Sequence, residues 1–165
     1  MKELLPNLIE ALREELKQYG EMLARLDHQQ HLVMRRQTDD LNRAVADINA
    51  QAEVIAAARA EREQHQRHLA RHLKLAEDAG FGALVPRLPA DYRPLVQALV
   101  QENNELLVRV RQRARQNHLL LSHAVEHMQR LINLIVPGGG PTTYDGTGQV
   151  PGSGLPRRSL YEAVG

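Results

Sequence analysis

Apolar residues in the first part of the chain recur at steps of three and four positions. This spacing places them on one face of an α-helix, because a helix has 3.6 residues per turn. The series is Leu5, Leu8, Leu12, Leu16, Tyr19, Leu23, Leu26 and Val33, with Gln30 as its only polar member. The pattern predicts a first helix from about Leu4 to about Met34, with Pro6 in its first turn, where its missing N–H costs nothing.

A second helix is predicted after the polar segment 35–40. Thr38 is the expected N-cap, and Asp39 and Asp40 place negative charge in the first turn, where the helix dipole favours it. The apolar series is Leu41, Val45, Ile48, Ala52 and Ile55, interrupted by Arg59, Arg62 and Gln66 and resumed by Leu69 and Leu73. The interruption predicts that the middle of this helix faces water or extends past its neighbours. The helix is expected to end near Ala79, and the short connection predicts an antiparallel hairpin with the first helix.

Two glycines and three prolines mark residues 79–94 as a hinge. Gly80 is a natural residue to follow the end of the second helix, and Asp91 is the expected cap of a third helix with Pro94 in its first turn. We expect four apolar residues of the hinge to close one end of the bundle. They are Phe81, Leu84, Val85 and Leu88.

The third helix is predicted from about residue 92 to 136. Its apolar series is Leu95, Leu99, Leu106, Val110, Leu121, Ala124, Met128, Leu131 and Ile135. Asn103 and Asn117 occupy seam positions of this series. A buried Asn there fixes the register of helix packing, but an Asn at an exposed end of the seam has no such role, and the sequence leaves both readings open.

Composition changes abruptly after Val136. Gly and Pro account for 12 of the 29 residues from Pro137 to Gly165. A segment so rich in Gly and Pro cannot bury enough apolar surface to offset the loss of chain entropy on folding. We therefore predict an all-α fold: an elongated antiparallel bundle of three long helices over residues 1–136, with the hinge at 80–91 leaving room for a short helix, and a flexible tail over residues 137–165.

Charge and composition exclude several functions. With 21 basic and 20 acidic residues, no overall field attracts the chain to nucleic acid. Four alternating arginines, Arg109, Arg111, Arg113 and Arg115, spread around their helix and form no basic stripe. The apolar runs are too short for a membrane span and no secretory signal is present, so we expect a cytoplasmic protein that does not insert into membranes.

Candidate chemistry is sparse. Two histidine pairs, His68 with His72 and His123 with His127, have the four-residue spacing of a metal-binding face, but solvated histidines on long helices are far commoner. No phosphate-binding loop, nucleophile elbow or HExxH motif is present. We therefore predict no enzymatic activity, no metal and no cofactor.

The last part of the third helix is apolar on more than one side. Leu119, Leu120, Leu121, Val125, Met128, Leu131, Ile132, Leu134, Ile135 and Val136 contribute to this surface. A helix that packs on a hairpin needs a single apolar stripe, so the surplus indicates a partner site, unless the first two helices or a second copy cover it. Tyr144 is an aromatic residue in the predicted tail and suits a short docking motif, although it could also lack a role.

Two segments carry a resemblance to a known family. The first is LIEALREEL (8–16), and the second is QRLINLIVPGGGPTTYDGTGQ (129–149). Together with the long helical hairpin, they resemble the FlgN family of flagellar export chaperones over roughly residues 1–150.

The resemblance implies a helical cytoplasmic chaperone that holds the C-terminal helical region of the hook-filament junction proteins FlgK and FlgL. It also implies delivery of this cargo to the export gate protein FlhA. Its cargo-binding residues would be Leu120, Leu121, Val125, Met128, Leu131, Ile132 and Ile135, and Tyr144 would dock on the gate. The alternative is a coiled-coil scaffold or spacer whose apolar surplus serves self-association in a tight dimer, whereas a weak homodimer is compatible with the chaperone.

Overall fold

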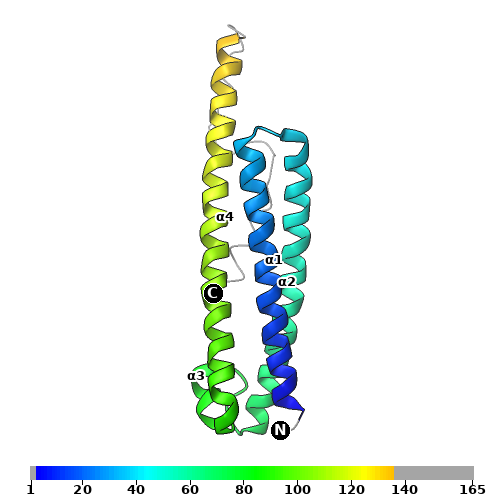
Figure 1. The fold of residues 1–165 in the computed structure, drawn as a ribbon, viewed down its shortest axis with the longest axis vertical. Coiled ribbons are helices and arrows are strands. Elements are labelled where there is room, and N and C mark those ends of the chain that lie inside the picture. The colour runs from blue at the N-terminus through cyan, green and yellow to red at the C-terminus, as the bar shows by residue number, and fades with distance from the viewer. Residues whose placement is uncertain (1–2, 136–165) are drawn as a thin grey trace, which may run out of the picture.

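Residues 3–135 fold into helices that form an elongated molecule (Figure 1). A computed structural model describes these residues, apart from the side chains of Thr38 and Asn133. The elements are α1 (Leu4–Met34), α2 (Thr38–His72), α3 (Phe81–Leu84), the short 3-10 turns η1 (Val85–Arg87) and η2 (Ala90–Tyr92), and α4 (Arg93–Ile135). The predicted all-α class is confirmed. The predicted tail, 137–165, lies outside the described residues.

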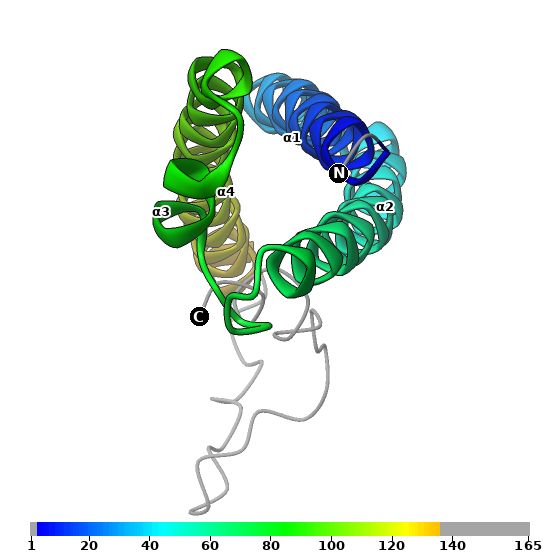
Figure 2. The same ribbon diagram turned by 90° about the horizontal axis from the view of Figure 1, so that it is seen from below.

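Helix α1 is the central element of the bundle. It packs against α2 on one side and α4 on the other, whereas α2 and α4 contact each other little (Figure 2). Helices α1 and α2 form the predicted antiparallel hairpin. Helix α4 runs parallel to α1, because the chain returns through α3 and the two 3-10 turns before α4 begins (Figure 1). The antiparallel arrangement therefore holds for neighbours in sequence, and the α1–α4 contact is a parallel one.

Both long helices of the hairpin end in the same way, with a basic residue in the left-handed region. Arg36 and Lys74 each have a φ of 57°. The N–H of Gln37 donates to the carbonyl of Leu32 at 3.1 Å, and the N–H of Leu75 donates to that of Ala70 at 2.9 Å. These are Schellman motifs, which satisfy carbonyl groups that a helix end leaves free.

Three sequence predictions about helix ends are wrong. Helix α2 ends at His72 rather than near Ala79, because the Schellman turn at Lys74 stops it, so Gly80 instead precedes α3. Thr38 lies inside α2, and the residue at the N-cap position, Gln37, makes no side-chain capping bond. Asp91 lies within η2, one residue too early to cap α4, which begins at Arg93.

The core consists of two apolar clusters along the bundle. The lower cluster joins the start of α1, the end of α2 and the start of α4, and Leu84, Val85 and Leu88 are buried in it with Phe81 packed against it. The prediction that these hinge residues close one end of the bundle is confirmed. The upper cluster is centred on Tyr19, Met22, Leu26, Ile48 and Val110. A fully buried leucine contributes about 1.5–3 kcal/mol, so these clusters supply most of the favourable free energy of folding.

The polar interruption of α2 packs against α1, so the prediction that it faces water is wrong. Arg62 lies across from Glu15 of α1, and its Nε donates to Glu15 Oε2 at 2.9 Å, with the two side chains 13% and 5% exposed. The Tyr19 hydroxyl donates to the other Glu15 oxygen at 2.9 Å. Burial, with the Glu15 carboxylate beside it, raises the pKa of Tyr19, so the phenol stays neutral and donates. The pairing with Glu15 allows a polar Arg62 inside an apolar seam.

Candidate partner-binding surface

Two buried asparagines of α4 fix its position along α1. The Nδ2 of Asn103 donates to the carbonyl of Leu12 at 3.0 Å, and the Nδ2 of Asn117 donates to the carbonyl of Leu26 at 2.7 Å. Both asparagines are buried. Their spacing along α4 equals the spacing of Leu12 and Leu26 along α1, two heptads in each case, so the two helices stay in register. Of the two readings of these residues, the register-fixing one is supported.

This register leaves the end of α4 without a companion. The residue numbers of the paired positions on α1 and α4 differ by the same amount at both asparagines. Applied to Met34, the last residue of α1, this difference in numbering gives Val125 as the residue of α4 at the same level. Helix α4 continues to Ile135, about ten residues farther, which corresponds to roughly 15 Å of helix. Figure 1 shows this end of α4 projecting past the hairpin.

The seam of α4 does not change character where α1 ends. Up to Asn117 the seam positions are Val96, Leu99, Asn103, Leu106, Val110, Ala114 and Asn117, all buried or half-buried. Steps of three and four residues continue with Leu121, Ala124, Met128, Leu131 and Ile135. Met128 is 56% exposed and Ile135 is 77% exposed. An apolar stripe of the kind that packs on α1 thus continues past the end of α1, half-buried at Leu121 and exposed from Ala124 onward.

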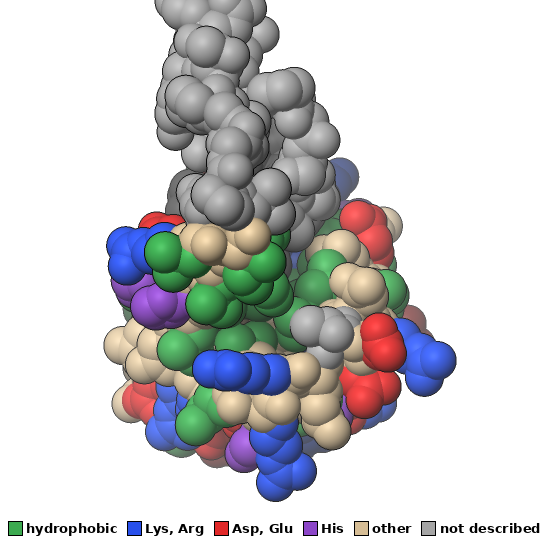
Figure 3. Space-filling view, turned by 90° about the horizontal axis from the view of Figure 1, so that it is seen from above, with side chains coloured by type: hydrophobic (Ala, Val, Ile, Leu, Met, Phe, Trp, Pro, Cys, Tyr) green, Lys and Arg blue, Asp and Glu red, His purple; other side chains and the backbone are tan. Residues whose placement is uncertain are grey.

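An apolar groove lies where the exposed stripe meets the end of the hairpin. It has a volume of about 440 Å³. One wall is α4, with Leu120, Leu121, His123, Ala124, His127, Met128 and Leu131, and the other side is Leu32, Val33, Arg36, Gln37 and Leu41. Seen from above, apolar side chains gather at this end of the molecule, with basic, acidic and histidine side chains around them (Figure 3).

The sequence-predicted cargo residues divide into two groups. Leu120, Leu121, Met128 and Leu131 line the groove. Val125, Ile132 and Ile135 lie on the same end of α4 but do not line it, and they are exposed. Tyr144, the predicted gate-docking residue, lies outside the described residues. The prediction that residues of the last part of α4 leave apolar surface uncovered by the described helices is confirmed.

Sequence reasoning missed the hairpin side of the groove. Val33 and Leu41 belong to the ends of α1 and α2, and their positions in the apolar stripes gave no sign that they meet the end of α4. The difference in length between α4 and α1 could have indicated these residues. Because α4 is longer, the hairpin ends beside it and its end residues face the remaining part of α4. That comparison requires knowing that α4 runs parallel to α1.

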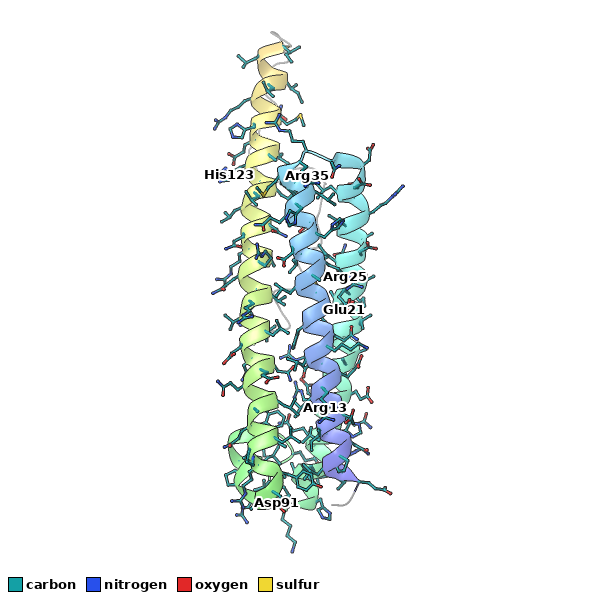
Figure 4. The ribbon with its side chains drawn as sticks, viewed as in Figure 1. Arg13, Glu21, Arg25, Arg35, Asp91 and His123 are labelled. Carbon is teal, nitrogen blue, oxygen red and sulfur yellow. The ribbon has the colours of Figure 1, made fainter. Side chains whose placement is uncertain are left out.

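Cationic and titratable side chains surround the groove. Arg36, His123 and His127 line it, and Arg130 lies on the same helix end. Figure 4 shows His123 on α4 and Arg35 at the end of α1 at a similar height along the bundle. Asp39 and Asp40 occupy the first turn of α2, as predicted, but they do not line the groove. The groove therefore has a mainly apolar lining, to which one arginine and two histidines contribute.

The other candidate sites do not assemble. Among residues 3–135, no three or more His, Cys, Asp or Glu side chains come together as a metal site requires. Of the four alternating arginines, Arg113 forms an ion pair with Asp27 of α1 at 2.9 Å, and it also donates to Gln30. None of the helices in the described part of the chain is long and apolar enough to cross a bilayer.

The protein is an elongated helical bundle with one projecting, apolar helix end, a surface of the kind at which proteins bind one another. The sequence model described as "FlgN protein" matches residues 1–152. The chain therefore belongs to the FlgN family, which is a family of chaperones rather than enzymes, and membership suggests a role as a flagellar export chaperone. No curated protein and no solved structure matches the chain.

Proposed function

We propose that this protein is a cytoplasmic chaperone for the hook-filament junction proteins FlgK and FlgL. It binds their C-terminal helical region before export and delivers them to the export gate protein FlhA. The observation that carries the proposal is the uncovered end of α4, where seven large aliphatic side chains between Leu119 and Ile135 are each about half exposed or more. Family membership supports the same role.

The physical reason is that the exposed stripe lacks a helix to pack on. An amphipathic cargo helix buries its own apolar face and the seam of α4 in a single step, which protects both from aggregation. Met128 lies in the centre of the exposed stripe, and its unbranched, flexible side chain accommodates cargo helices of different shape. Binding of this kind is reversible and needs no nucleotide.

The test is calorimetric titration with a peptide of the FlgK C-terminal helical region. The variant Leu131→Asp with Ile135→Asp places two charges in the exposed seam and is expected to weaken binding at least tenfold. Val108→Asp is the matched control, because Val108 is 48% exposed on α4 but lies on its opposite side from the seam. Absence of peptide binding to the parent protein, or equal binding to the parent and the double variant, would reject the cargo assignment.

Tyr144 is proposed to dock on the export gate. This role rests on the family resemblance of the segment around Tyr144 and on the contact area that an aromatic ring provides. Tyr144→Ala is expected to leave affinity for the cargo peptide unchanged and to weaken association with FlhA several-fold in a pull-down with purified protein. Equal association of the two proteins with FlhA would remove Tyr144 from the site.

The same exposed stripe supports a second candidate function. A homo-oligomeric coiled-coil scaffold would bury the end of α4 against a second copy. Sedimentation distinguishes the two functions: a tight dimer that does not bind the FlgK peptide indicates the scaffold, and a monomer or weak dimer that binds it indicates the chaperone.

A further inference from the structure

We infer that the partner helix is seated in the groove between α4 and the hairpin end, rather than on the exposed surface of α4 alone. This inference deepens the proposed function and rests on it for the identity of the partner. It assigns a binding role to Val33, Leu41 and Arg36, which come from α1, α2 and their connection. The partner is an amphipathic α-helix with a stripe of aliphatic side chains and an acidic flank.

Continuity with the α1–α4 interface is the first argument. The seam positions of α4 that pack on α1 continue into the groove as Leu121, Ala124, Met128 and Leu131 without a break in spacing. A helix placed there packs against α4 as α1 does farther down, and one of its ends meets the hairpin. The groove is therefore shaped for a helix that extends the bundle upward from the hairpin.

The floor of the groove is the second argument. Val33 and Leu41 are half-buried, and neither belongs to the two core clusters, so part of the apolar surface of each remains uncovered by the bundle. Together with Leu32 they form an apolar floor beneath the wall of α4. A helix bound only to the outer surface of α4, near Val125, would leave this floor exposed to water. Burial of both surfaces by one helix is more favourable, since the gain grows with the apolar area removed from water.

The partner's seam is expected to be aliphatic throughout. In the covered part of the α1–α4 interface, asparagines at 103 and 117 donate to backbone carbonyls of α1. The next position at this spacing is Leu131, which lines the groove. The exposed seam therefore has no polar group to satisfy one on the partner, and an unpaired polar group would be costly to bury. Because no polar side chain of this seam fixes the register of the partner, helices of different sequence fit in the groove.

Charge defines the partner's flank. Arg36, His123 and His127 line the groove, and Arg130 follows on the same end of α4, where the Glu126 carboxylate lies 3.8 Å from the His123 ring. An acidic residue that flanks the apolar stripe of a partner would face the Arg36 guanidinium, as charged flanking residues do in coiled coils. Such rim charges mainly set orientation and the rate of association.

The experiment compares three single variants of the full chain with one FlgK-type peptide in calorimetry. Leu41→Glu alters the groove but not α4, Val125→Glu alters the exposed end of α4 outside the groove, and Val108→Glu adds the same charge farther down α4. We expect Leu41→Glu to weaken binding about tenfold or more, Val125→Glu to weaken it less than Leu41→Glu does, and Val108→Glu to change it less than threefold. Circular dichroism and thermal unfolding check that Leu41→Glu is folded, and the milder Leu41→Ala, expected to weaken binding several-fold, replaces it otherwise.

The outcomes separate this inference from the proposed function. Unchanged binding by Leu41→Glu with a tenfold loss in Val125→Glu would overturn the groove and leave the chaperone role intact. Failure of the parent protein to bind the peptide would reject the chaperone role itself. A parent dimer that Leu41→Glu dissociates would show that a second copy occupies the groove, which also overturns the inference.

Discussion

The two parts of α4 share one sequence pattern and have opposite environments. From Arg93 to Asn117 the seam is buried against α1, and from about residue 118 to Ile135 a seam with the same spacing is largely exposed. The difference arises because α1 ends at Met34, not because the pattern of α4 changes. An apolar stripe therefore shows that a helix needs a companion, but it does not show whether the companion belongs to the same chain.

The first prediction contrasts one substitution in the two regions. Leu8→Ala removes a fully buried side chain of the lower core and is expected to lower the free energy of unfolding by about 2–5 kcal/mol. Leu134→Ala, at a residue 78% exposed, is expected to change it by less than about 0.5 kcal/mol. Urea unfolding followed by circular dichroism measures both. A comparable loss in the two variants would mean that the end of α4 is covered in solution.

The second prediction removes an asparagine from the buried part of the α4 seam and adds one to the exposed part. Asn117→Ala removes the donor to the Leu26 carbonyl and is expected to cost about 1–3 kcal/mol of unfolding free energy. Leu131→Asn, at the next position of the same spacing, is expected to leave stability unchanged because the residue is 54% exposed. The same variant is expected to weaken binding of the cargo peptide. If Asn117→Ala were as stable as the parent, the buried amide would have no part in holding α1 and α4 together.

The third prediction concerns the closeness of the α1–α4 contact in the buried region. A methyl group added at Gly20 would lie 4.0 Å from Leu106 Cδ2, an ordinary van der Waals distance. Gly20→Ala is therefore expected to raise the free energy of unfolding by up to about 1 kcal/mol through helix propensity. Ala24→Gly, at an exposed position of the same helix, is the reverse change and is expected to lower it by a similar amount. Destabilisation by Gly20→Ala would show that α1 and α4 pack closer than this distance.

Much of the fold could be predicted from local patterns. The bounds of α1 agree with its apolar series, and the hinge residues Leu84, Val85 and Leu88 are buried as their composition indicated. The predictions that failed depended on contacts between segments or on backbone conformations that the residue type disfavours. Arg62 interrupts the stripe of α2, and only the position of Glu15 on α1 explains why it packs inward. The end of α2 at His72 likewise depends on Lys74 adopting a left-handed conformation, which its residue type disfavours.

The sequence by itself determined the class of fold, the length of α1 and the excess of apolar residues near the end of α4, because these depend on periodicity and composition alone. Only the tertiary structure decided which apolar surface remains exposed. That outcome depends on the parallel packing of α4 on α1 and on the register fixed by Asn103 and Asn117. This register places Met34, where α1 ends, at the same level as Val125. The groove beside Leu41 exists because two helices of different length start near the same end of the bundle, and no local pattern records that difference.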